Sequence, residues 1–448
     1  MDFNAFKEIV IAECRRLGIQ DYELYYECGA STSVGAFQHE INEFSSSEDG
    51  GLCFRCIVDG KMGYASTQQL SEEEARNVVA NAIDNASVLE SEDIMFLGEG
   101  GQEYEPLDRK SYDLPSTEEM IETVLAAQEK LYAADPAVID GSQSQVLSES
   151  SEVCIYNSRG LDLQYKNQLA GMLAVAVVSN GQEMANDYQV KLGRISQIDK
   201  DALTKKAAAT ALRKLGGDPA PTGQYPVVFD SEAMSDLLAT FSGIFSSEAA
   251  QKGLSKFAEA EGTVVAAPLV TLWDDPFHRE NPMPMNFDAE GSPTHKKAII
   301  EKGVLNTLLY NLKTAHKAGK KTTGNASKGG YDSPVGISPF SFVLEGGEKS
   351  EEQLLKEVGN GVYINSLSGL HAGADPISGD FSLQSAGFMI ENGEKTRAVK
   401  SFTVAGNFYQ MLKDIAAVAN NSHLPNPMGH TAFGAPTTVV NGLSIAGK

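Results

Sequence analysis

The sequence predicts an α+β protein, with N-terminal α+β regions built on antiparallel sheets and a β-rich antiparallel C-terminal domain. Three observations predict this class. The first hundred residues follow the order helix, several strands, helix, instead of a regular alternation of strand and helix. A break rich in Gly and Pro at 216–223 separates the N-terminal half from the rest. After that break, short apolar stretches alternate with glycine turns almost to the last residue.

The first predicted domain, residues 1–100, starts with apolar residues that recur at helical spacing. Alternating apolar and polar residues then predict strands, and a Ser-x-x-Glu capping box predicts the start of a second helix. In chain order we expect a helix from Phe6 to Leu17, strands at 21–28 and 32–44, a hairpin around Asp59-Gly60-Lys61, and a helix from Ser71 to about Leu89.

Residues 91–115 are rich in Glu, Gly and Pro and are predicted to be a linker. The second α+β domain, 110–217, should contain a helix capped by Ser116, a β meander and a helix at about 199–214. The third domain, 224–448, should begin with a strand at 225–230 and a helix from Ser231 to about Ser246. Its further strands are expected at 263–273, 298–310, 340–344, 361–367, 382–390, 397–405 and 437–445.

The charge is negative and unevenly distributed. The 448 residues carry a net charge of -24, and residues 1–150 hold 9 basic against 30 acidic residues. Such a field repels phosphate backbones, so we expect no nucleic acid as a partner. Five irregularly spaced cysteines imply no disulfide framework. Neither a signal peptide nor an apolar stretch of 18 residues is found, so we expect no membrane contact and a cytoplasmic location.

Histidine and cysteine spacing predicts no metal site and no cofactor in this chain. Residues 1–277 contain only His39, in a segment that resembles a strand, where residues i and i+4 are too far apart to share a metal. His423 and His430 flank a Pro-rich loop and are the remaining candidates. Cys53 and Cys56 have redox-motif spacing, but residues i and i+3 of a strand point to opposite faces, which favours buried apolar roles.

Two acidic clusters remain, Asp274-Asp275 and Asp288-Ala-Glu290-Gly291. A carboxylate pair could bind Mg²⁺ or act as acid and base. The alternative is a solvated loop, or a turn in which the Asp caps the backbone ahead of Gly291. The residues alone therefore give no complete catalytic set.

Seven stretches of the C-terminal half occur in an order that resembles the TldD/PmbA family, long labelled modulators of DNA gyrase and understood as subunits of a cytosolic metallopeptidase. The Gly51–Ser66 hairpin extends the resemblance over nearly the whole chain. The stretches are Val265–Asp275, Asn286–Thr294, Ile299–Leu305, Thr323–Ala326, Ser378–Ser382, Ala386–Gly393 and Val404–Asn407.

The resemblance implies that this chain lacks the family's metal site. The TldD-like branch carries His-Glu-x-x-x-His and a Cys near the C-terminus. The corresponding positions here fall near Leu238, Ala239 and Gly243, no His lies between 40 and 277, and no Cys follows Cys154. Asp236 is the only carboxylate close by. The chain therefore resembles the PmbA (TldE) branch, the metal-free partner.

This resemblance implies a non-catalytic subunit that pairs with a TldD-like subunit, which would carry the zinc, and processes or degrades small unfolded peptides. A homodimer is expected when the partner is absent. Two alternatives stay open: a stand-alone peptidase with an unconventional site around Asp288, Glu290, His423 or His430, and a protein-binding modulator of DNA gyrase. The motif positions expected to line the peptide cleft are Asp288, Glu290, Gly291, Gly324, Asn325, Gly379, Asp380, Gly406 and Asn407.

Overall fold

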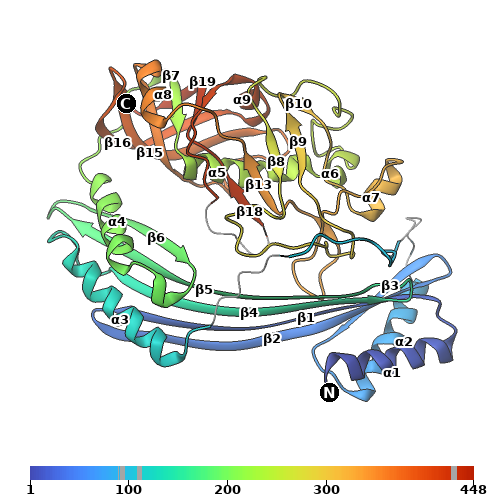
Figure 1. Ribbon diagram of the computed structural model, residues 1–448. Coiled ribbons are helices and arrows are strands. Elements are labelled where there is room, and N and C mark those ends of the chain that lie inside the picture. Colours follow the sequence, from blue (N-terminus) through green and yellow to red (C-terminus); the bar gives the residue numbers. More distant parts are fainter. Residues whose placement is uncertain (89, 91–95, 108–113, 425–430) are drawn as a thin grey trace.

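One curved sheet of six antiparallel strands joins the two N-terminal regions (Figure 1). The computed structural model describes residues 1–88, 90, 96–107, 114–424 and 431–448. The sheet order is β3-β2-β1-β4-β5-β6, so strands from before and after the expected linker pair directly. The strands are β1 (Asp21–Phe37), β2 (Glu40–Val58), β3 (Lys61–Thr67), β4 (Gln143–Asn157), β5 (Asp162–Ser179) and β6 (Met184–Leu192).

Two pairs of helices cover the outer face of this sheet, one pair at each end (Figure 1). Successive side chains of a strand point to opposite faces. On β1, Leu24 packs against α1 and α2 and Val34 packs against α3, whereas Tyr25 faces the C-terminal domain. The helices are α1 (Phe3–Leu17), α2 (Glu72–Val88), α3 (Thr117–Ala133) and α4 (Lys200–Arg213), with a short 3-10 helix at Ile195–Gln197 before α4.

The C-terminal domain is built on a closed ring of strands. Its order is β16-β15-β14-β7-β19, and the ring closes because β16 also pairs with β19; β17 extends it beside β19. Most pairings are antiparallel, but β7 with β14 and β13 with β18 are parallel. The ring strands are β7 (Gly223–Phe229), β14 (Gly361–Ser368), β15 (Asp380–Glu391), β16 (Glu394–Asn407), β17 (Ile415–Val418) and β19 (Thr438–Ala446).

A second sheet, of order β10-β9-β8-β13-β18, packs beside the ring with the central helix α5 in the shared core (Figure 1). Its strands are β8 (Leu272–Asp274), β9 (Lys297–Glu301), β10 (Val304–Leu305), β13 (Ser341–Leu344) and β18 (Ala432–Gly434); β11 (Ala326–Ser327) and β12 (Gly336–Ile337) form a separate ribbon. The helices are α5 (Ser231–Phe241), α6 (Ser247–Gln251), α7 (Leu312–Lys317), α8 (Glu351–Val358) and α9 (Phe408–Asp414), with a 3-10 helix at Ser242–Phe245.

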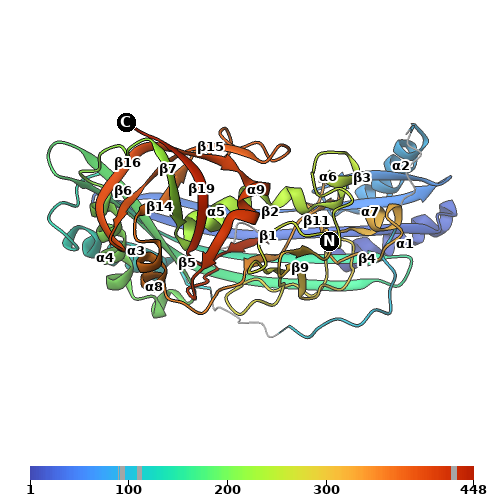
Figure 2. The ribbon, with the colours of Figure 1, turned by 90° about the horizontal axis from the view of Figure 1, so that it is seen from above.

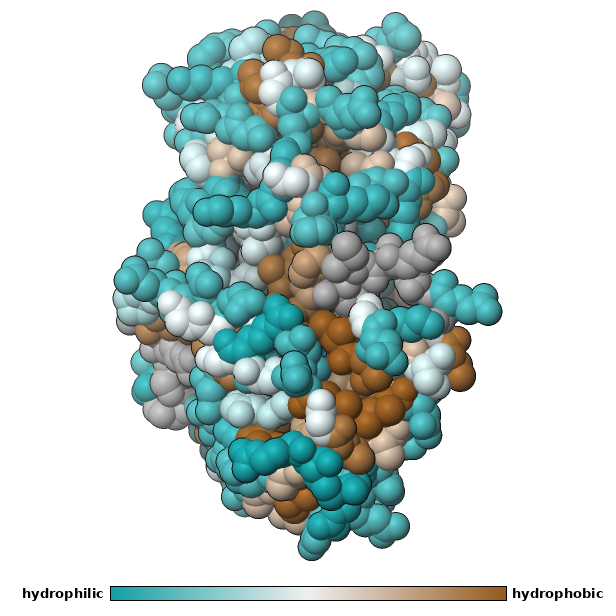
Figure 3. All heavy atoms as spheres, turned by 90° about the vertical axis from the view of Figure 1, so that its right-hand side faces the viewer, coloured by the Kyte–Doolittle hydropathy of each residue, from teal (hydrophilic) through white to brown (hydrophobic). Residues whose placement is uncertain are grey.

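The C-terminal domain lies over the inner face of the curved sheet and contacts it in two zones (Figures 1 and 2). One zone is an apolar cluster that joins Tyr25 and Ile155 of the sheet to Phe287 of the C-terminal domain. The other zone is at the β5–β6 turn, where Glu183 pairs with Lys400 of β16. Seen from the side of α1 and α2, the surface is mostly hydrophilic, and apolar side chains gather in its lower half (Figure 3). No described helix is both long and apolar enough to span a bilayer.

The α+β class with antiparallel sheets is confirmed, and so is the Asp59-Gly60 hairpin, whose left-handed φ values of 50° and 77° suit a tight turn between β2 and β3. The single strand at 32–44 is wrong, because Gln38 and His39 have φ values of 50° and 64° and turn the chain from β1 into β2. The strand at 263–273 is also wrong, since only Leu272–Asp274 is a strand. Pro268 cannot donate to a ladder there, and Ala267 N–H donates instead to Leu412 O at 2.9 Å.

Candidate functional site

The motif positions expected from the sequence form two groups in different parts of the C-terminal domain. One group lies where the C-terminal domain meets the curved sheet; it comprises Asp288, Glu290, Gly291, Gly324 and Asn325. The other lies where β15 and β16 meet α9; it comprises Gly379, Asp380, Gly406 and Asn407.

Asp288 closes its own loop from a buried position, with 1% of its surface exposed. Its Oδ1 accepts the N–H groups of Glu290 and Ser292, each at 2.9 Å, and its Oδ2 accepts the Ala326 N–H at 2.9 Å. Burial raises the pKa of Asp288, and these backbone donors act against that rise. The carboxylate therefore caps backbone groups, which is the structural alternative that the sequence left open.

Glu290 lies where the C-terminal domain meets the sheet. Its Oε2 accepts the Leu312 N–H at 2.8 Å, and burial raises its pKa while the nearby charge of Arg55 opposes the rise. Arg55 of β2 is itself paired with Glu23 of β1, with Nε and Nη2 at 2.8 and 2.7 Å from Oε1. These two side chains are only 5% and 2% exposed, and Nη2 has no well-directed hydrogen bond despite its short distance. Three ionisable groups therefore lie near one another inside the junction. Sequence reasoning did not identify two of them, Glu23 and Arg55.

Asn325 belongs to a second buried network around Asp274. Its Nδ2 donates to Asp274 Oδ2 at 2.7 Å and to Ser338 O at 3.0 Å, and Lys297 Nζ donates to the same Oδ2 at 2.9 Å. The charge of Asp274 is thus offset by Lys297. Gly324 has a φ of +68°, and a Cβ there would lie 2.4 Å from the Pro293 carbonyl oxygen. This network holds the loop in place and offers no accessible carboxylate.

The second group fixes a surface loop to α9. Asn407 Nδ2 donates to Ser378 O at 2.9 Å and to Asp380 Oδ1 at 2.7 Å, and Asn407 Oδ1 accepts the Gln410 N–H at 3.3 Å as the cap of the helix. Asp380 is exposed. The two glycines allow close packing, because a Cβ at Gly379 or Gly406 would lie 2.4 Å from Tyr409 or 2.6 Å from Leu443.

The histidine candidates do not come together as far as the structure describes them. His423 Nδ1 lies 3.1 Å from Glu280 Oε2, and His430 lies outside the described residues. Among the described residues, no group of three His, Cys, Asp or Glu side chains is placed to hold a metal ion. Cys53 and Cys56 pack in different clusters on opposite faces of the sheet, as predicted from their spacing.

The helix at which the resemblance places the metal motif, α5, does not fit a zinc ion. Leu238 is buried in the core, Ala239 has no ligand atom, and Gly243 lies in the 3-10 turn that follows. The charged side chains on the exposed side of this helix are Glu232 and Asp236, one turn apart. Burial and then the charge of Glu232 raise the pKa of Asp236 to about 6. The Asp236 side chain is exposed to solvent, although many protein atoms surround its carboxyl group.

The β6 surface, defined here as Met184 and Tyr188 on β6 with Glu232 and Asp236 on α5, was not found from the sequence. Both β6 residues lie on the face that points to the C-terminal domain, because Tyr188 pairs with Val175 and Met184 with Ser179 on the inner side of β5. Burial, then the charges of Asp236 and Glu232, raise the pKa of Tyr188. The strand and the helix thus face each other across the inner side of the sheet (Figure 1).

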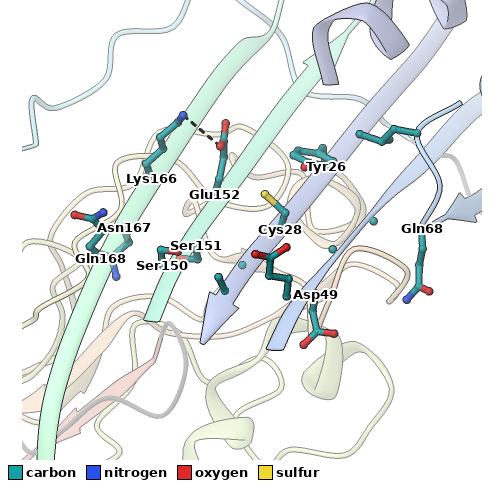
Figure 4. A pocket seen from close by; sticks show the side chains of 16 residues that line it. Tyr26, Cys28, Asp49, Gln68, Ser150, Ser151, Glu152, Lys166, Asn167 and Gln168 are labelled. Carbon is teal, nitrogen blue, oxygen red and sulfur yellow. Dashed lines mark ion pairs between the residues drawn. The ribbon is translucent and has the colours of Figure 1, made fainter. Parts of the chain in front are cut away.

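A hollow of about 930 Å³ lies on the outer face of the sheet, between the two helix pairs (Figure 4). Its floor carries Tyr26, Cys28 and an ion pair in which Lys166 Nζ lies 3.2 Å from Glu152 Oε2. Gln68 and Asp49 line the opposite side in the same view. The floor is polar and of mixed charge, and it holds none of the motif positions.

Three family models match the chain. They are the PmbA/TldA metallopeptidase domain 1 at residues 22–86, the central domain at 110–215 and the C-terminal domain at 222–447. Among curated proteins, Metalloprotease PmbA of Escherichia coli O157:H7 is 26% identical over 396 residues, which cover 87% of this chain and 85% of that protein. The Metalloprotease TldD homolog of Buchnera aphidicola is 25% identical over 459 residues, which cover 95% and 93%.

Solved structures share the fold over nearly the full length. A Thermotoga maritima protein described as a presumed modulator of a DNA gyrase has a TM-score of 0.89 and 30% identity, covering 99% of this chain and 100% of that one. TldE from Thermococcus kodakarensis has a TM-score of 0.88 at 23% identity, with the same coverage. The fold of this chain, including both groups of motif positions, is therefore shared with these proteins.

Proposed function

Because the chain belongs to the PmbA/TldD metallopeptidase family, we propose that it is the non-catalytic subunit of a two-component peptidase. The observation that carries this proposal is the composition of α5. This helix and the 3-10 turn after it have Leu238, Ala239 and Gly243 at the positions of the metal motif, none of which can bind zinc or activate a bound water. Relatives are named both PmbA and TldD, and both are called metalloproteases, which supports a peptidase family with two branches.

In this proposal a TldD-like subunit supplies the zinc and the catalytic glutamate, and this chain helps enclose and hold the substrate. Small unfolded polypeptides are the expected substrates, since an extended chain can pair with a sheet edge through its main chain whatever its sequence. The net charge of -24 argues against nucleic acid as a ligand. The five cysteines are all free, which suits a reducing compartment such as the cytoplasm. Without its partner, the chain is expected to form a homodimer.

The test is to purify this chain and a TldD-like chain from the same organism separately, and to measure zinc content and cleavage of an unfolded peptide alone and after mixing. We expect well below one equivalent of zinc and no cleavage for this chain alone, with cleavage and a stable complex on mixing. Stoichiometric zinc with activity in this chain alone would overturn the proposal in favour of a stand-alone peptidase. His423→Ala and Glu290→Gln variants would then show which of the remaining candidates takes part.

A gyrase-binding modulator is the second candidate, favoured by the descriptions of two solved relatives, from Thermotoga maritima and Bacteroides thetaiotaomicron. The acidic surface makes protein contact the expected mode, because DNA contact requires phosphate neutralisation. A pull-down of purified gyrase subunits with the immobilised chain tests this candidate. Retention of gyrase at physiological salt, with no association with a TldD-like chain, would favour it over the peptidase subunit.

A further inference from the structure

The N-terminal sheet ends in an edge strand, β6, that no other described strand pairs on its outer side. One of its backbone donors, the Tyr188 N–H, donates to the neighbouring Asp187 Oδ1 at 2.7 Å. An edge strand presents a row of unpaired N–H and C=O groups, which is a template for an additional strand. The opposite edge strand, β3, packs one face against α2, and β6 likewise packs one face against α4. The two edges are therefore distinguished by the side chains that they expose.

Apolar side chains are exposed along this edge on the inner side. Met184 and Tyr188 are 70% and 62% exposed, more than any other large apolar side chain on a described strand. They are four residues apart and so project from the same face of the strand. Core packing explains neither of them. An added strand would cover part of both side chains, which gives their exposure a physical use.

The opposing helix face is acidic and unneutralised. Glu232 and Asp236 are exposed on α5, and neither has an ion pair among the described residues. Two lysines that contact the β6 region are already paired, since Lys214 pairs with Asp187 at 2.9 Å and Lys400 pairs with Glu183. A ligand that enters between strand and helix therefore meets uncompensated negative charge.

We propose that the β6 surface binds an extended basic polypeptide segment, which adds a strand to β6 and places alternate Lys or Arg side chains against Glu232 and Asp236. This rests on the proposed function, because it assumes that the chain receives unfolded peptide. The spacing fits: residues four apart on a helix are separated by about 6 Å along its axis, and alternate residues of an extended chain by about 6.8 Å. Main-chain pairing gives binding that ignores sequence, and the two carboxylates add a preference for basic segments.

The test uses the full chain and three fluorescein-labelled unfolded peptides of equal length, with Lys, Gln or Glu at alternate positions, followed by fluorescence anisotropy. We expect the Lys peptide to bind most tightly and the Glu peptide least. Two exposed charge pairs correspond to a threefold to tenfold loss of affinity, roughly, when both carboxylates are removed. The double variant E232Q/D236N should show this loss for the Lys peptide and no change for the Gln peptide.

A matched control separates local contact from overall charge. The variant E122Q/E129Q removes two exposed carboxylates from α3, on the outer side of the sheet, and changes the net charge by the same amount. It should bind all three peptides like the wild type. Methylating the backbone nitrogens of the Lys peptide at alternate residues should weaken binding, because it removes main-chain donors without any change in the protein.

The outcomes distinguish the inference from the function on which it rests. Equal binding of the three peptides, an unchanged E232Q/D236N variant, or an equal loss in the control variant would overturn the basic-peptide inference and leave the subunit role standing. Full binding of the N-methylated peptide would overturn strand addition. Absence of any peptide binding, together with no cleavage after mixing with a TldD-like chain, would overturn the proposed function as well.

Discussion

Replacing Arg55 with methionine should weaken the junction between the curved sheet and the C-terminal domain. The change removes the cation that pairs with Glu23, and both side chains are almost fully buried. Removal of one partner of a buried ion pair costs about 3–5 kcal/mol, because the other charge stays in a poorly solvated place. Glu290 loses the same neighbouring charge, so its pKa should rise further.

A double variant separates the cost of an orphaned charge from the contribution of the pair itself. In E23L/R55M both charges are replaced by apolar side chains, and such exchanges are often close to neutral. Asn157 Nδ2 would lose its 3.3 Å contact with Glu23 Oε2 but keep its bond to Gly98 O at 2.8 Å. We therefore expect the double variant to lie within about 2 kcal/mol of the wild type.

The assay is urea unfolding followed by fluorescence and by far-UV circular dichroism. Trp273, the only tryptophan, lies in β8 and reports the C-terminal domain, whereas dichroism reports both halves. The control is Arg76→Met, which breaks an exposed pair with Glu72 and should cost less than about 1 kcal/mol. A loss of stability below about 1 kcal/mol in R55M, or a double variant as unstable as the single one, would refute this reasoning.

Three further predictions follow from single positions. Gly324→Ala should destabilise the protein by about 2–4 kcal/mol in urea unfolding, because of its positive φ and its contact with Pro293, whereas Gly319→Ala, with a similar φ and open space, should cost only about 1–2 kcal/mol. Burial raises the pKa of Glu290, so its contribution to folding stability is full below the unfolded pKa of 4.5 and is lost as the pH rises through the folded pKa. Glu290→Gln should therefore flatten the decline of the urea unfolding midpoint with rising pH. An unchanged slope in this pH series would contradict the prediction. With a thiol reagent, Cys28 should react first in the native protein because the other four cysteines are buried, and several fast thiols would argue against the fold.

Features that depend on residues close together in the chain could be predicted from the sequence. The Asp59-Gly60 turn and the Ser116 cap of α3 are local arrangements, in which a left-handed backbone or a side-chain acceptor is decided within a few residues. The turn at Gln38-His39 was not predicted, because it contains no Gly, Asn or Asp and is fixed by the long-range pairing of β1 with β2. Many residues of the candidate site were likewise recognised from sequence motifs, but the sequence did not predict that their side chains are buried.

The sequence by itself determined the α+β class, several helices and turns, and the lack of a His or Cys on α5, since periodicity, turn residues and residue identity are properties of the chain alone. Only the tertiary structure decided that Glu23 and Arg55 of the sheet lie near Glu290 from the other half of the protein, and that β6, which faces α5, has no described strand on its outer side. A two-residue alternation shows that a strand has two faces but not which element covers each one. Packing between segments far apart in the sequence determines which face and which edge of the sheet remain uncovered among the described residues. The candidate peptide surface lies on that face and edge.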